Sequence, residues 1–291
     1  MSSFCISVNL KEAVRHLDTL PAMPVIAQKI LALNLESDEG EQAMLRLIEK
    51  DPQIAAKIIG LANTPLFGTS KRVVSVMDAA LLLGITRVKS VTMGVAVMSA
   101  LVGKSTGILD VQELWLHSLS ISMAMRIISR AMPRNAPPVE DEILLAGLLH
   151  DIGYLVLNHL DPERSDELQA RFKQDKERSS IQIESEFLEM NHSELGAELA
   201  RFWDLPDSIV AVLRYHHDPE SEDADMAQPL VRMINLAEKV LVDFGLSEGA
   251  AGIASAEEWL ALGVDPDQTD ELIGQITTQA EEIRQFAGNF L

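Results

Sequence analysis

Signals that start and stop helices recur along this chain, and they constrain its fold more than any other feature. Asp51 stands directly before Pro52, and an aspartate caps the free N–H groups of a first helical turn, where proline also fits. Ser75 and Asp78 form a second capping pattern, and Gly84 is a typical helix stop. Apolar residues follow these signals at helical spacing, and the first half of the chain has no useful stretch of strand-like alternation. The sequence therefore predicts an all-α fold.

The spacing of apolar residues gives approximate positions for the helices. Helices are expected at about residues 10–17, 25–35, 40–49, 52–62, 79–83 and 86–103, and then at 111–130, 140–149, 193–203 and 206–217. The apolar helix at 140–149 is expected to continue through His150 and Asp151 toward His159. The charged residues 161–191 are expected to form exposed helix and loop, and the acidic run 218–225 a loop. Further amphipathic helices are expected from residue 247 onward, at positions that the sequence does not give.

The composition allows a large buried core. Hydrophobic residues make up 47% of the 291 residues and aromatic residues only 4%, a mixture that favours helices over sheets. The longest apolar stretch, at about residues 91–103, is shorter than the roughly 20 residues that cross a bilayer, and its Ser and Gly residues suit a buried helix. No membrane segment is therefore expected.

The net charge of −20 argues against two classes of partner. A surface with this much negative charge repels nucleic-acid backbones and anionic lipids. Neither nucleic acid nor a membrane is therefore expected as a partner. Cys5 is the only cysteine and allows no disulfide within the chain, and residues 1–10 lack the basic and apolar segments of a secretion signal. A cytoplasmic location is expected.

Six of the seven histidines lie after residue 110, and most have an acidic residue nearby. Glu113 and His117 are four residues apart and would share one face of a helix. His150 is followed directly by Asp151 in apolar surroundings, where an unpaired charge is costly. Imidazoles and carboxylates together suit iron, manganese, zinc or a similar divalent metal, and a carboxylate can bridge two ions. The candidate metal ligands are Glu113, His117, His150, Asp151, His192, His216, His217 and Glu238.

Each of these candidates also has an ordinary structural explanation. The pair His150–Asp151 could be a buried hydrogen bond without metal. Glu238 could be an exposed helix acid, although its apolar neighbours favour partial burial. Glu113 is either a ligand of a third metal or a solvated acid that pairs with nothing. His216 and His217 point in different directions on a helix, which suggests one ligand and one supporting or surface residue.

The histidine series resembles that of a known family of metal-dependent enzymes. The run Leu-Leu-His-Asp-Ile-Gly at residues 148–153 resembles the His-Asp signature of the HD superfamily of metal-dependent phosphohydrolases. The fuller series is similar to the ligand set of its HD-GYP branch: His117, His150 with Asp151, the run His-Ser-Glu-Leu-Gly-Ala at 192–197, His216 with His217, and Glu238 in place of the usual closing Asp.

That resemblance implies a centre of two divalent ions, such as iron or manganese. His117, His150, Asp151 and Glu238 would hold one ion, and Asp151, His192 and His216 or His217 would hold the other. If the protein is an enzyme, Asp151 would bridge the ions and a metal-bound hydroxide would be the nucleophile.

The first half resembles a particular subfamily. Leu-Pro-Ala-Met-Pro at 20–24, Asp-Pro at 51–52, Ala-Asn at 62–63, Phe-Gly at 67–68 and residues 79–84 are similar to the N-terminal signature of HDOD domains. The resemblance covers about residues 10–245 and implies an HD-type helical fold of two packed lobes, as in bacterial signalling proteins. Many members have lost the metal ligands and act through contacts with other proteins. The lobes are expected at 1–108 and 109–245, with a C-terminal helical extension at 246–291.

The chain departs from both groups. Unlike many HDOD proteins it keeps nearly all the metal-site histidines. Unlike the HD-GYP enzymes it has Tyr154 where their signature continues with Lys, and no Gly-Tyr-Pro follows His217. In those enzymes these features contact the phosphate and guanine of the substrate. Three hypotheses remain: a signalling protein with a two-metal centre that acts on a partner protein or senses a ligand, a phosphohydrolase acting on a nucleotide or cyclic dinucleotide, and a metal-free helical scaffold.

Overall fold

The computed structural model of the protein describes residues 20–64, 72–101, 107–133, 140–241 and 253–286, together with Leu10 and Pro138. Helices make up most of these residues, and no strand occurs among them. The expected all-α class is therefore confirmed. The expected first helix, at 10–17, lies outside the described residues except for Leu10.

The N-terminal part is a group of short helices followed by one long one. Its members are α2 (Val25–Leu31), α3 (Asp38–Glu49), α4 (Pro52–Ala62), α5 (Val76–Leu83) and α6 (Ile85–Leu101). The capping signals act as the sequence predicts. Asp51 accepts the backbone N–H groups of Gln53 and Ile54, and Ser75 accepts that of Asp78. Gly84 has a φ of 87°, which glycine adopts without strain, and α5 and α6 meet there at 119°.

Several helix boundaries in this part differ by a few residues from the sequence-based expectation, most clearly the end of α2 and the starts of α3 and α5. Helix α2 ends at Leu31 and not near 35, because the following residues form the cap of α3. The hydroxyl of Ser37 donates to the Asn34 carbonyl and accepts the Gly40 N–H, so α3 starts at Asp38. Side-chain hydrogen bonds of this kind compete with continuation of the helix.

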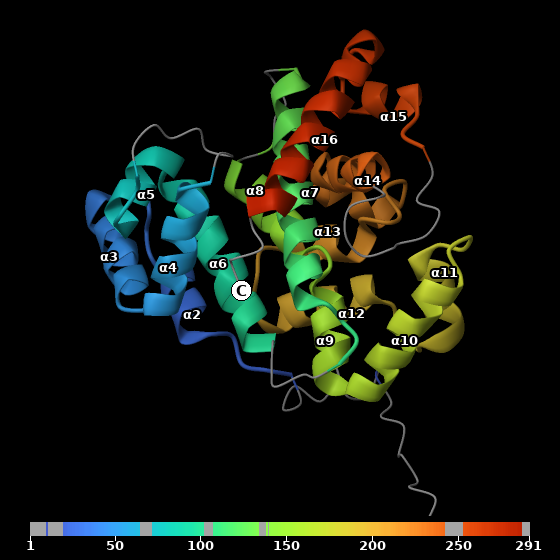
Figure 1. The fold of residues 1–291 in the computed structure, drawn as a ribbon, viewed down its shortest axis with the longest axis horizontal. Coiled ribbons are helices and arrows are strands. Elements are labelled where there is room, and N and C mark those ends of the chain that lie inside the picture. Colours follow the sequence, from blue (N-terminus) through green and yellow to red (C-terminus); the bar gives the residue numbers. More distant parts are fainter. Residues whose placement is uncertain are drawn as a thin grey trace, which may run out of the picture.

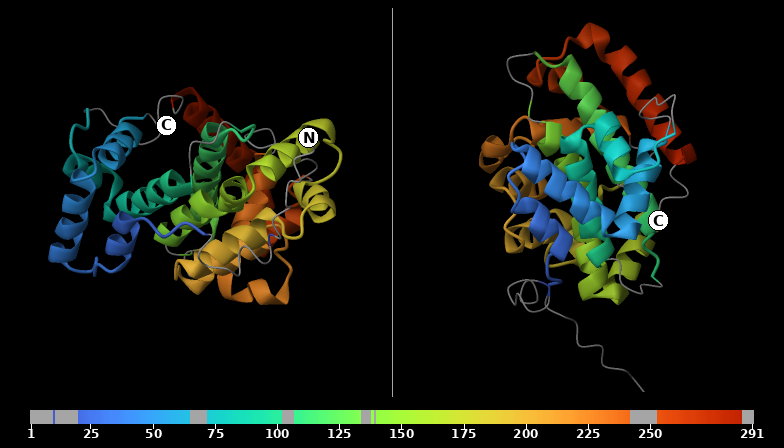
Figure 2. Two further views of the ribbon diagram at one scale, coloured as in Figure 1. Left: turned by 90° about the horizontal axis from the view of Figure 1, so that it is seen from below. Right: turned by 90° about the vertical axis from the view of Figure 1, so that its left-hand side faces the viewer.

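The fold has two lobes joined through α6. Figure 1 shows α2 to α5 on one side of α6 and the remaining helices on the other, and the left view of Figure 2 shows the same division. Helix α6 packs against α2, α4 and α5 on one side and against α8 and α9 on the other. It is buried on nearly every face from Val88 to Met98, which explains why its sequence is apolar without a polar stripe.

The second lobe contains α7 (Val111–Ala131), α8 (Glu140–Leu149), α9 (Ile152–Leu160), α12 (His192–Phe202), α13 (Asp207–Tyr215) and α14 (Leu230–Val240). The expected continuous helix through His150 and Asp151 is wrong, because these two residues form a turn between α8 and α9. The stretch Glu142–Leu160 is long and apolar enough to cross a membrane, but 89% of it is buried inside the protein. It has the character of a core helix.

Two further segments pack more closely than their composition suggests. Helix α10 (Pro162–Gln174) packs on α9, and α11 (Ser180–Phe187) packs on α10. The two helices bury Leu168, Phe172 and Ile183 as well as the carboxylate Glu184. The expectation that residues 161–191 are merely exposed is therefore wrong. The acidic run expected as a loop ends in a short 3-10 helix, Glu222–Ala227.

The helices near the C-terminus pack on the second lobe. Helix α15 (Ala256–Ala261) is tied to α14 by an ion pair between Lys239 and Glu258, and α16 (Thr269–Phe286) lies along α7. These are the amphipathic helices whose positions the sequence does not give.

Candidate metal centre

The candidate ligands come from five places in the second lobe. His117 is in the middle of α7, His150 and Asp151 form the turn between α8 and α9, and His192 is the first residue of α12. His216 and His217 directly follow α13, and Glu238 is in α14. All of them except His217 are buried. The structure gathers seven of the eight candidates into two adjoining groups.

His117, His150 and Glu238 form the first group. The Nε2 atoms of His117 and His150 are 3.3 Å apart, and Oε1 of Glu238 is 3.5 Å from Nε2 of His150. Glu238 is only 5% exposed, so its alternative explanation as an exposed helix acid is wrong.

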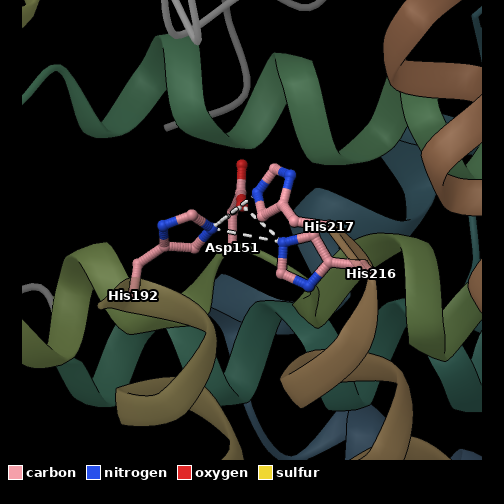
Figure 3. A group of neighbouring side chains, drawn as sticks. All are labelled: Asp151, His192, His216 and His217. Atoms are coloured by element: carbon pink, nitrogen blue, oxygen red, sulfur yellow. Dashed lines mark hydrogen bonds and ion pairs between the residues drawn. The ribbon is translucent and has the colours of Figure 1, made fainter. Parts of the chain in front are cut away.

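Asp151, His192, His216 and His217 form the second group, shown in Figure 3. Nε2 of His192 is 3.2 Å from Nε2 of His216 and 3.1 Å from Nε2 of His217. Both consecutive histidines therefore turn toward the same centre. They can do so because α13 ends at Tyr215, and the suggestion that only one of them faces the site, which assumed a continuing helix, is wrong.

Asp151 stands between the two groups. Its Oδ2 atom is 3.3 Å from Nε2 of His117 and 3.2 Å from Nε2 of His150. Its Oδ1 atom is 3.3 Å from Nε2 of His192 and 3.7 Å from Nε2 of His216. One oxygen therefore faces each group, which is the geometry of a carboxylate that bridges two cations.

The polar atoms of this centre fit divalent metal ions. Asp151 is fully buried, yet neither carboxylate oxygen has a hydrogen-bond partner of normal geometry. Buried carboxylates without partners are rare and costly. Several imidazole nitrogens also point at one another at close range, and lone pairs repel there unless a proton or a cation lies between them. Nitrogen and carboxylate donors of this kind are typical ligands of iron, manganese or zinc.

Hydrogen bonds at Nδ1, on the side of the ring away from the centre, hold His150 and His216 in the orientation that metal binding needs. Nδ1 of His150 is 2.9 Å from the Gly147 carbonyl, and Nδ1 of His216 is 2.9 Å from the Leu213 carbonyl. A carbonyl only accepts, so each Nδ1 carries the proton and each Nε2 presents its lone pair to the centre. Both histidines obtain this bond from a carbonyl three residues earlier, at the end of a helix.

Glu184 performs the same task for His192 and was missed by the sequence analysis. Its carboxylate accepts the backbone N–H of His192 at 2.7 Å and lies 2.9 Å from Nδ1 of the ring. The Tyr154 hydroxyl donates to the same carboxylate at 2.9 Å, and the Tyr154 ring stacks on His192 with centroids 4.3 Å apart. Tyr154 is therefore committed to the support of a candidate ligand.

Gly153 allows these segments to approach one another. A Cβ atom at this position would lie 1.8 Å from the backbone carbonyl oxygen of His192. Only glycine therefore lets the start of α9 contact the start of α12. This contact brings Asp151 and His192 to the same centre.

The electrostatics of the metal-free centre reflect this crowding. Burial would raise the pKa of Asp151, but His150, His117 and His192 hold it well below the usual value, so Asp151 is a carboxylate. Burial would lower the pKa of His192, but Glu184 and Asp151 raise it well above the usual value. Burial lowers the pKa of His216 to about 4. Burial and the neighbouring His216 and His192 lower the pKa of His217. The second group therefore contains one charged histidine and two neutral ones near pH 7.

Glu113 lies apart from the centre, and nothing supports a third metal there. It is one turn before His117 on α7, 43% exposed, and its Oε2 atom is 4.0 Å from Arg284 of α16. The pairing with Arg284 also departs from the expectation of a solvated acid without any partner.

Comparisons with known proteins agree with the fold. The family model of the HDOD domain matches residues 20–219. A solved structure from Geobacter sulfurreducens, an HDOD domain protein with unknown function, is 24% identical with a TM-score of 0.78, covering 97% of this chain and 98% of that one. One from Marinobacter aquaeolei VT8, provisionally described as a signal transduction protein, is 26% identical with a TM-score of 0.78. One from Shewanella amazonensis SB2B, provisionally described as a phosphohydrolase, is 22% identical with a TM-score of 0.73, covering 95% of this chain and 98% of that one.

Two of the matched proteins are longer than this chain. The Marinobacter match covers 97% of this chain but 65% of the other protein. An uncharacterized protein of Treponema pallidum (strain Nichols) is 22% identical over 203 residues, which is 70% of this chain and 38% of the relative. This chain thus spans less than two thirds of the length of both.

Proposed function

Because the chain belongs to the HDOD family, we propose that it is a cytoplasmic signal-transduction protein with a centre for two divalent metal ions, and that it acts through contacts with a partner protein. The observation that carries the proposal is the position of Asp151, with one carboxylate oxygen toward each of two ligand groups. Both oxygens of Asp151 are buried without a hydrogen-bond partner, and such a carboxylate is costly unless a cation balances it.

Each of the two ligand groups would hold one of the two ions. His117, His150 and Glu238 would hold the first ion, His192, His216 and His217 the second, and Asp151 would bind both. Bound divalent ions would polarise a phosphate oxygen or acidify a water molecule. Within the chain, Asp151 supplies negative charge between the groups, and the Nδ1 hydrogen bonds keep the Nε2 atoms turned inward.

The signalling proposal is favoured over hydrolysis by the surroundings of Tyr154. At this place the related enzymes have a lysine that contacts the substrate phosphate, whereas the Tyr154 hydroxyl is hydrogen-bonded to Glu184 and its ring is buried. After His217 the chain continues with Asp218 and Pro219 and not with Gly-Tyr-Pro. The features that grip a cyclic dinucleotide are therefore replaced, while the metal ligands are kept.

The second candidate is a metal-dependent phosphohydrolase acting on a nucleotide or cyclic dinucleotide. The presence of two groups of candidate ligands, buried except for His217, favours it, as does the likeness to a structure provisionally described as a phosphohydrolase. Two cations held close together by a shared carboxylate would also stabilise both the attacking and the leaving oxygen in phosphoryl chemistry.

An assay of turnover separates the two candidates. The protein is reconstituted with Mn²⁺ or Fe²⁺ and incubated with a panel of nucleotides, cyclic mononucleotides and cyclic dinucleotides, with the Asp151→Asn variant as control. The signalling proposal expects bound metal without turnover above the control. Hydrolysis that requires Asp151 would establish the phosphohydrolase in its place.

A further inference from the structure

A cavity of about 440 Å³ is lined by residues of α4, α6 and α7, at the seam of the two lobes. Helix α6 contributes Val95, Met98 and Ser99, which are spaced by three and four residues and so lie on one face. Helix α4 of the N-terminal lobe contributes Lys57. The volume is within the range of sites that bind small molecules, about 300 to 1,000 Å³.

Helix α7 forms the remaining wall with the face that does not carry the metal ligand. Val111, Gln112 and Trp115 line the cavity and share one side of the helix by the same spacing. His117 is two residues beyond Trp115, about 200° further around a helix of 3.6 residues per turn. None of the seven gathered metal ligands is among the described residues that line the cavity.

The polar groups that line the cavity favour a negative ligand. Lys57 is half-buried, and this burial lowers its pKa, with Asp51 acting in the opposite direction. Among the described lining residues Lys57 is the single charged side chain, and none carries a carboxylate. A partly desolvated cation gains from an anionic partner.

We propose that this cavity binds a small organic anion, a molecule with an apolar body and one carboxylate end. Val95, Met98 and Val111 would bury the body, and Lys57 would pair with the carboxylate. The ligand would contact helices of both lobes at once. The site is independent of the metal centre, and it stands whether or not metal is bound.

The test uses 4-phenylbutyrate as the probe and 4-phenylbutan-1-ol as its uncharged counterpart. Binding to the full chain is followed by NMR through the indole N–H signals of the three tryptophans, assigned with Trp115→Phe. The Trp115 signal is expected to shift with saturation, whereas those of Trp203 and Trp259, which do not line the cavity, are expected to stay. The alcohol is expected to bind at least about tenfold more weakly, because it lacks the charge-assisted bond to Lys57.

Matched variants localise the effect. Lys57→Met is expected to weaken binding of 4-phenylbutyrate about tenfold and to remove its advantage over the alcohol. Lys29→Met, which removes an exposed lysine of α2, is expected to leave the affinity unchanged. Ser99→Phe, a substitution of an exposed residue at the cavity, is expected to block both probes. Circular dichroism and thermal unfolding verify that the variants are folded.

Two results would overturn the proposal. One is the absence of a saturable Trp115 shift at millimolar concentrations of the carboxylate. The other is binding that does not depend on the site. Such binding would be equally strong for 4-phenylbutyrate and the alcohol, or 4-phenylbutyrate would bind with unchanged affinity to both folded variants, Lys57→Met and Ser99→Phe.

Discussion

Glu184 holds His192 at two points, with its carboxylate 2.7 Å from the backbone nitrogen and 2.9 Å from Nδ1 of the ring. The first contact fixes the start of α12, and the second fixes which ring nitrogen faces the centre. One buried carboxylate thus sets both the position and the tautomer of a candidate metal ligand.

Glu184→Gln is expected to weaken metal binding at the second group about 10- to 100-fold, the usual effect of removing a residue that orients a metal ligand. Glutamine keeps the shape of the side chain but loses the charge that favours the Nδ1–H tautomer. Competition with a chelator measures the affinity, and NMR of the imidazole nitrogens measures the tautomer. Glu189→Gln, an exposed neighbour, is the control. If Glu184→Gln and Glu189→Gln bind metal with equal affinity, Glu184 does not orient a metal ligand.

Tyr154→Phe is expected to lower the free energy of unfolding by about 1–3 kcal/mol, because it leaves a buried acceptor on Glu184 without its donor. The stacking on His192 would remain, so metal binding should weaken less than in Glu184→Gln. Urea unfolding of the metal-free protein gives the stability. A variant as stable as the unmodified protein would show that this hydrogen bond contributes nothing.

Gly153→Ala is expected to cost more than about 1–3 kcal/mol of stability and to abolish metal binding at the second group, because the new Cβ would lie 1.8 Å from the His192 carbonyl oxygen. Gly274→Ala in α16 is the matched control, since a Cβ there meets nothing within 4 Å, and helix propensity predicts a gain of about 0.5–1 kcal/mol. Thermal unfolding of both variants checks the difference. Similar behaviour of the two would contradict the close approach of α9 and α12.

Metal affinity at the second group is expected to fall as the pH is lowered through the neutral range. The pKa of His192 is raised above its usual value, so the metal-free protein carries a proton there that the ion must displace. The pKa of His216 is lowered to about 4, so His216 is already neutral above pH 5 and adds no such competition. About one proton should therefore be released from this group per ion near pH 7. Calorimetry in buffers of different ionisation enthalpy measures the release, and binding without net proton release would contradict the assignment.

Local features of the fold could be predicted from the sequence because their causes are local. Asp51, Ser75 and Gly84 act on backbone groups within a few residues of themselves, so the helices that they start or stop were placed correctly. The turn at His150 and Asp151 was not predicted, since the apolar run continues across it without a local stop signal.

The site could be predicted in part. The histidine series gives the residue types, and the structure gathers His117, His150, Asp151, His192, His216, His217 and Glu238 as the resemblance implied. Glu184 was missed because it stands in a charged segment where nothing local separates a buried acid from an exposed one. Glu113 is four residues before His117 and was therefore expected on the same face of the helix. Its carboxylate lies toward Arg284 of α16 instead, a helix whose position the sequence does not give.

The stoichiometry of bound metal tests the central claim most directly. Elemental analysis of the full chain, reconstituted with Fe²⁺ or Mn²⁺ without oxygen and freed of excess ion, should give about two ions per chain, one for each group around Asp151. Asp151→Asn should lose both, and His117→Ala only the ion of the first group. A folded, reconstituted protein that binds no metal would contradict the account and leave a helical scaffold.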